Sequence, residues 1–185
     1  ADAKRLYPCF HQPDLKARFT FTVTAPADWQ VISNGATVST EPAPGGGTRH
    51  AFATTEPMST YVTALVAGPY HVVGAGHHDG IDLGLFCRST LAEHLDAERL
   101  FTQTKQGFDF YHQAFGVRYP FGKYDQLFVP EFNAGAMENA GAVTFREEYV
   151  FRSRVTRYLY ERRCETVLHE MAHMWFGDLV TMRWW

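Results

Sequence analysis

Apolar and polar residues alternate in short runs between Leu15 and Cys87. The run from Ala17 to Val23 is one of them, and Asn34-Gly35 provides the residues of a tight turn between two others. Successive side chains of a strand face opposite sides, so this alternation predicts strands that each have one buried face. Several short strands at this spacing predict an antiparallel β-sandwich or sheet module.

The pattern changes near Ser89, where apolar residues begin to recur every three or four positions. Thr90-Leu91-Ala92-Glu93 has the form of a capping box, which predicts the start of a long helix that ends at Gly116. Its buried side is expected to hold Ala97, Phe101, Thr104, Phe108, Tyr111 and Phe115. The change of period predicts an α+β protein with a β module at residues 1–88 and a mixed part at residues 89–185.

A second helix is expected between Thr156 and Met174, a stretch without glycine or proline. His169 and His173 are four residues apart there, so both imidazoles lie on one helical face and point at one position. Glu170 is offset by about 100° around the helix, which leaves room for a water molecule between its carboxylate and a metal ion. This pattern is typical of a zinc site in which the glutamate is a general base. The alternative is a pair of surface histidines.

Composition and charge exclude some classes of partner. Among 185 residues, 17 Lys and Arg and 20 Asp and Glu give a net charge of −3, so neither nucleic acid nor an anionic membrane is an expected partner. No apolar stretch approaches the roughly 18 residues of a membrane span. Cys9, Cys87 and Cys164 form no Cys-x-x-Cys pair, which predicts reduced thiols in a cytoplasmic protein. The terminal Trp184-Trp185 suggests a fragment of a longer protein.

Three segments resemble the M1 family of zinc aminopeptidases, which belong to the gluzincins. Gly135-Ala136-Met137-Glu138-Asn139 is similar to the family's GAMEN motif and precedes the histidine pair by some thirty residues. Residues 7–17 are similar to the family's PCFDQPDLKA stretch, and residues 173–185 to the end of its active-site helix and the turn after it. The resemblance is closest to the aminopeptidase N branch, of a bacterial type. It implies the latter part of an N-terminal β domain followed by the first part of a thermolysin-like catalytic domain.

The resemblance implies a role for each matching residue of the catalytic centre. His169 and His173 would bind Zn²⁺, and Glu170 would be the general base that activates a water molecule. Glu138 would pair with the α-ammonium group of a peptide substrate that has a free N-terminus. A carboxylate shielded from water gains more from an ammonium ion than from a neutral amide, so this role is physically reasonable.

The resemblance also implies residues that hold the substrate. The backbone of Gly135 and Ala136 would hydrogen-bond the peptide, within the same motif as Met137 and Asn139. Glycine lets a substrate backbone come close, as the addition of an extended peptide to a strand edge requires. Gln12 would help to hold the amino terminus and to shape the first side-chain pocket, although a polar residue of a proline-rich turn is an equal alternative.

The chain departs from the family pattern in two places. His11 stands where the family has Asp. The family supplies its third zinc ligand as a Glu about twenty residues after the second His, and an oxyanion-stabilising Tyr beyond that, whereas this chain has 12 residues after His173. Asp178 leaves the face of the histidines, so it is not expected to be a ligand. With two ligands instead of three, the fragment itself is expected to bind zinc weakly and to be inactive.

Three other functions remain open at this stage. One is a zinc endopeptidase of the thermolysin kind, and another is a family relative that hydrolyses epoxides. The third is a non-catalytic module that binds a peptide or a protein partner through its β part. The preferred interpretation is a zinc-dependent aminopeptidase that hydrolyses the first peptide bond of its substrate.

Overall fold

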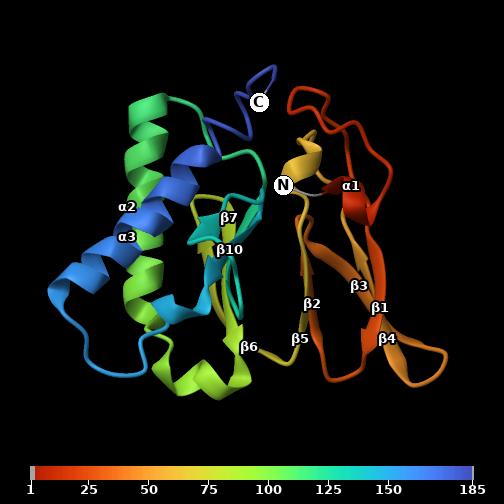
Figure 1. Ribbon diagram of the computed structural model, residues 1–185, viewed down its shortest axis with the longest axis horizontal. Coiled ribbons are helices and arrows are strands. Elements are labelled where there is room, and N and C mark those ends of the chain that lie inside the picture. The colour runs from red at the N-terminus through yellow and green to blue at the C-terminus, as the bar shows by residue number, and fades with distance from the viewer. Residues whose placement is uncertain (1–2, 185) are drawn as a thin grey trace.

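The computed structural model describes residues 3–184, apart from the side chain of Ala75, and arranges them in three layers (Figure 1). The N-terminal strands form one layer, a five-stranded sheet forms the middle layer, and two long helices form the third. A short helix, α1 (Ala3–Leu6), comes before the first strand. The layers confirm the α+β class that the change of period predicts.

The N-terminal layer contains only antiparallel pairs, as its alternating sequence predicts. Strands β1 (Thr22–Pro26), β4 (Gly47–Phe52) and β3 (Thr37–Ala43) form a three-stranded sheet in that order. A separate pair joins β2 (Gln30–Ser33) to β5 (Leu65–Gly68). A single turn of 3₁₀ helix, η1 (residues 60–62), lies between β4 and β5.

The five-stranded sheet is mixed. Its order is β6 (Tyr70–His78), β7 (Ile81–Arg88), β8 (Lys123–Val129), β10 (Ala142–Arg146) and β9 (Ala136–Met137). The pairs β7–β8 and β8–β10 are parallel, and the pair at each edge is antiparallel. The sequence predicts that β6 and β7 belong to the β module at residues 1–88, whereas in the structure both strands belong to this mixed sheet. The predicted domain boundary at residue 88 stays a prediction. The pairing of β7 with β8 joins strands from the two sides of this boundary.

The two long helices are α2 (Ala97–Phe115) and α3 (Arg157–His173). The predicted capping box is wrong, because its residues form the 3₁₀ helix η2 (Ser89–His94) and Asp96 is the residue that precedes α2. The predicted end at Gly116 is confirmed, and Gly116 has a left-handed φ of 66°, which favours glycine. A further 3₁₀ turn, η3 (residues 147–149), follows β10. None of the helices in the described part of the chain is long and apolar enough to cross a membrane.

Both faces of the five-stranded sheet are covered. The helices pack on one face, in a core that includes Leu85, Phe108 and Met171. On the other face, Phe86 and Leu127 pack with residues of the N-terminal layer. Parallel strands in proteins are normally buried on both sides, and the middle of this sheet follows that rule. The N-terminal layer is therefore part of the same packed structure as the helix that carries the histidine pair.

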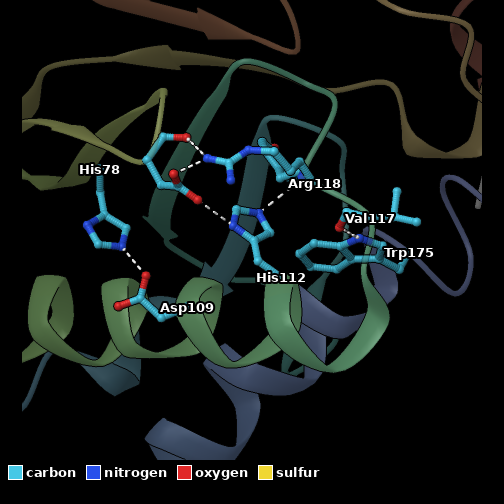
Figure 2. A network of polar contacts seen from close by, with 8 residues as sticks. His78, Asp109, His112, Val117, Arg118 and Trp175 are labelled. Atoms are coloured by element: carbon cyan, nitrogen blue, oxygen red, sulfur yellow. Dashed lines mark hydrogen bonds and ion pairs between the residues drawn. The ribbon is translucent and has the colours of Figure 1, made fainter.

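A polar network joins the turn between β6 and β7 to the end of α2 (Figure 2). His112 accepts a hydrogen bond at Nε2 from the backbone N–H of Tyr119 (3.0 Å), so its Nδ1–H donates to the carboxylate of Asp79 (2.7 Å). Trp175, just after α3, donates its indole N–H to the carbonyl of Val117 (2.8 Å). The loop after α2 is thus bonded both to the sheet and to the segment that follows the histidine pair.

Candidate metal centre and peptide site

Helix α3 brings two imidazole nitrogens together. The Nε2 atoms of His169 and His173 are 3.1 Å apart. Nitrogen ligands at about 2.0–2.1 Å from a tetrahedral zinc ion are roughly 3.3 Å from each other, so this spacing fits two ligands of one ion. The Nδ1–H of His173 donates to the carbonyl of Phe176 (3.0 Å), which leaves the lone pair on Nε2.

Glu170 lies beside the histidine pair and is buried, with 6% of its surface exposed. Burial raises its pKa to about 7, and the negative charge of Glu138 adds to the increase, while His173 lowers the pKa. The charge of His173 acts on this carboxyl group, so the two side chains lie within electrostatic range of each other. Such an environment suits a general base, because it keeps the carboxyl group away from bulk water.

The segment 135–139 forms the edge of the five-stranded sheet. Ala136 and Met137 pair with β10, and the carbonyl of Gly135 accepts a hydrogen bond from the backbone N–H of Arg146 (3.0 Å). Strand β9 is the last in the sheet order, so its second side has no strand partner among residues 3–184. The side-chain amide of Asn139 is buried and donates to Thr144 (3.1 Å), which fixes the end of the segment.

Glu138 follows this edge strand and is half-buried. Its charge raises the pKa of Glu170 and also that of Asp178, so the three carboxyl groups lie within electrostatic range of each other. A carboxylate next to an open strand edge and a histidine pair can bind an ammonium group of an extended peptide. The chain thus brings a histidine pair, a buried glutamate and a half-buried carboxylate into one region.

Family models match two parts of the chain. Residues 1–62 match the peptidase M1 N-terminal domain, and residues 100–185 match the peptidase family M1 domain. The chain belongs to peptidase family M1. The order of the two matches confirms the predicted N-terminal β domain followed by the first part of a catalytic domain.

Proteins named as aminopeptidases are similar to this chain over its whole length, which supports the assignment to family M1. It is 59% identical to aminopeptidase N of Streptomyces lividans, with all of the chain and 21% of that protein aligned. It is 38% identical to aminopeptidase N of Acetobacter pasteurianus and 35% identical to that of Mus musculus, again over the whole chain and over 52% and 20% of those proteins. The chain therefore spans between a fifth and a half of the length of these relatives.

His169 and His173 form a pair of candidate metal ligands in this M1 chain. Among residues 3–184, no group of three His, Cys, Asp or Glu side chains is arranged to hold a metal ion. The spacing of the His169 and His173 nitrogens is compatible with two positions of one zinc ion, and their role as ligands stays a prediction.

Gln12 lies in the N-terminal layer and makes a local contact. Its side-chain N–H donates to the carboxylate of Asp14 (2.6 Å), and the side chain is half-buried. A role in holding a substrate amino terminus stays a prediction for this residue. The local bond to Asp14 also agrees with the alternative, a polar residue of a proline-rich turn.

Sequence reasoning gave no role to Lys16 and considered Asp178 only as a rejected metal ligand. Asp178 is fully buried, and burial together with the charge of Glu138 raises its pKa well above the usual range of an aspartate. Lys16 contacts the same turn, and its charge lowers the pKa of Asp178. No sequence motif connects residues so far apart, and only the packing of the N-terminal layer on the end of α3 joins them.

Proposed function

We propose that this M1 chain is part of a zinc aminopeptidase that hydrolyses the first peptide bond of peptides with a free N-terminus. The observation that carries the proposal is the convergence of the histidine pair with a buried Glu170 and with Glu138 of the sheet edge. The names of the relatives and the family match support the same activity. The free Cys9, Cys87 and Cys164 support a cytoplasmic location.

The residues divide the chemical task between them. His169 and His173 would hold zinc, which supplies a Lewis acid that polarises the scissile carbonyl and acidifies water. Glu170 takes a proton from the attacking water as the C–O bond forms, and then delivers this proton to the nitrogen of the leaving peptide, so that the C–N bond breaks. The amine product and the free amino acid carry away all atoms of the water molecule.

Substrate binding depends on the strand edge and on Glu138. The backbone of Gly135 and Ala136 aligns an extended peptide, beside Met137 and Asn139 of the same segment. The carboxylate of Glu138 binds the α-ammonium group, which places the first peptide bond next to Glu170. An internal stretch of a polypeptide offers no ammonium group at that position, so it is rejected. Gln12 is proposed to help at the amino terminus.

The test compares two peptides that differ only in an acetyl group on the first nitrogen. The whole protein that contains these residues is expected to release the first amino acid from the free peptide and to leave the acetylated peptide intact. Metal analysis of the same sample is expected to find zinc. Equal cleavage of both peptides would indicate an endopeptidase instead. Hydrolysis of a lipid epoxide, with neither peptide cleaved, would indicate the epoxide-hydrolysing relative. The 185-residue chain alone is expected to be inactive, since it offers two ligands.

A further inference from the structure

Lys16 of the N-terminal layer reaches the turn that follows α3. Its ammonium group donates hydrogen bonds to the backbone carbonyls of Asp178 (2.5 Å) and Leu179 (3.2 Å). The partners are more than 160 positions apart in the sequence. The loop before β1, which contains Lys16, and the turn after α3 lie next to each other at one end of the molecule (Figure 1).

The turn that Lys16 contacts is bonded directly to His173. The backbone N–H of Asp178 donates to the carbonyl of His173 (2.9 Å), and the Nδ1–H of the His173 ring donates to the carbonyl of Phe176 (3.0 Å). The orientation of this imidazole therefore depends on the position of the turn. Partners that orient a ligand histidine in this way commonly change metal affinity by about 10–100-fold when they are removed.

Lys16 also supplies a positive charge where acidic groups gather. The carboxylate of Asp178 is fully buried, and neither of its oxygens has a hydrogen-bond partner among residues 3–184. The charges of Glu138 and Glu170 both raise the pKa of Asp178, so three carboxyl groups lie within electrostatic range of each other. Lys16 is the cation that opposes this effect on Asp178, and burial lowers the pKa of Lys16 itself.

We propose that Lys16 is a positioning residue that fixes the turn after α3 and, through it, the metal-binding ring of His173. The N-terminal β layer then takes part in the geometry of the catalytic centre through Lys16, besides covering the sheet. The inference rests on the proposed zinc aminopeptidase function. Lys16 itself does not contact the reacting atoms, since its hydrogen bonds go to backbone carbonyls of the turn.

The test uses variants of the whole protein. Lys16→Met removes the charge and all donors but keeps the length of the side chain, whereas Lys16→Arg keeps both the charge and the donors. Lys4→Met is the matched control, because Lys4 is exposed on α1. The readouts are the rate at which a chelator removes zinc, kcat and KM for a peptide with a free N-terminus, and the melting temperature.

Lys16→Met is expected to lose zinc about tenfold faster and to lower kcat about tenfold, with KM changed by less than about twofold. Lys16→Arg and Lys4→Met are expected to match the wild type in zinc release and kcat. If Lys16→Met does not fold, Lys16→Gln replaces it, with the same expected direction. Wild-type zinc release and kcat in the folded Met or Gln variant would overturn the positioning role, as would failure of Lys16→Arg to restore them. A wild-type protein without zinc or activity would contradict the proposed function instead.

Discussion

The Nε2 atoms of His169 and His173 lie 3.1 Å apart, and a backbone carbonyl fixes the ring of His173 from its other side. Replacing either histidine by alanine in the whole protein is expected to remove zinc and to lower kcat/KM by more than about 100-fold, because one ligand of the pair is lost. Metal analysis and peptide hydrolysis measure the two effects. His77→Ala is the control, since His77 is an exposed residue of β6. Normal zinc content in His169→Ala would exclude this residue as a ligand.

Glu170→Gln tests the proposed general base. The amide has nearly the same shape but cannot accept the proton, so kcat is expected to fall by about 10²–10⁴-fold while zinc stays bound. Steady-state hydrolysis together with metal analysis separates the two quantities. Glu161→Gln on the exposed side of the same helix is the matched control and should keep the wild-type kcat. A Glu170→Gln enzyme with normal kcat would assign the base to another residue.

Glu138→Gln tests the anchor for the amino terminus. A charge-assisted hydrogen bond to the substrate ammonium group is lost, so kcat/KM for a free peptide is expected to fall by about 10–100-fold. The kcat/KM for the N-acetylated peptide should change little. The ratio of kcat/KM for the free peptide to that for the acetylated peptide should therefore fall. Glu131→Gln, an exposed change shortly before β9, is the control. Selectivity equal to that of the wild type in Glu138→Gln would mean that another group recognises the amino terminus.

Asn34 connects the N-terminal layer to the sheet edge. Its amide donates to the carbonyls of Val62 and Ala140 (2.8 Å each) and accepts from the backbone N–H of Ala64 (2.8 Å). Asn34→Ala leaves these buried groups without partners, so the free energy of unfolding is expected to fall by about 2–4 kcal/mol. Urea denaturation of the 185-residue chain measures this change. The exposed Asn133→Ala is the control, and an equal effect of both variants would contradict the argument.

Asp79 gives the chain a specific response to acid. Hydrogen bonds from Arg118 and His112 hold the pKa of Asp79 below its usual value, with the bond from Arg118 as the larger cause. A carboxyl group whose pKa is lower in the folded state stabilises the fold above its unfolded pKa, and this contribution is lost as the pH falls through the folded value.

Asp79→Asn is therefore expected to lower the melting temperature at pH 7, and this effect is expected to shrink as the pH falls below the unfolded pKa toward the lowered folded pKa. Asparagine tolerates the left-handed backbone at this position, where φ is 53°, so the change tests the charge and not the turn. The exposed Asp28→Asn is the control and should not show this pH dependence. A difference between wild type and Asp79→Asn that is the same at pH 3 and pH 7 would contradict the linkage.

Local sequence patterns predicted the elements that carry the site. A four-residue spacing within a helix determines that two side chains share a face, so the convergence of His169 and His173 followed from geometry within one turn. The end of α2 at Gly116 was predictable for the same reason, since a left-handed residue closes a helix locally. The capping box at Thr90 failed because a pattern of four residues does not distinguish a 3₁₀ turn from the first turn of a long helix.

Contacts between distant segments were decided only by the tertiary structure. Alternation of apolar residues in β6 and β7 predicted strands with one buried face, but it does not say which strand lies beside them, and β7 is in fact buried on both faces. In the same way, no local pattern connects Lys16 with Asp178, whereas the tertiary structure buries Asp178 and brings Lys16 to its turn. The sequence alone determined the helix, the histidine pair and the family motif, because these depend on neighbours within a few residues. The burial of Glu170 and Asp178, and the joining of the N-terminal layer to the site, depend on contacts that form only when the three layers pack.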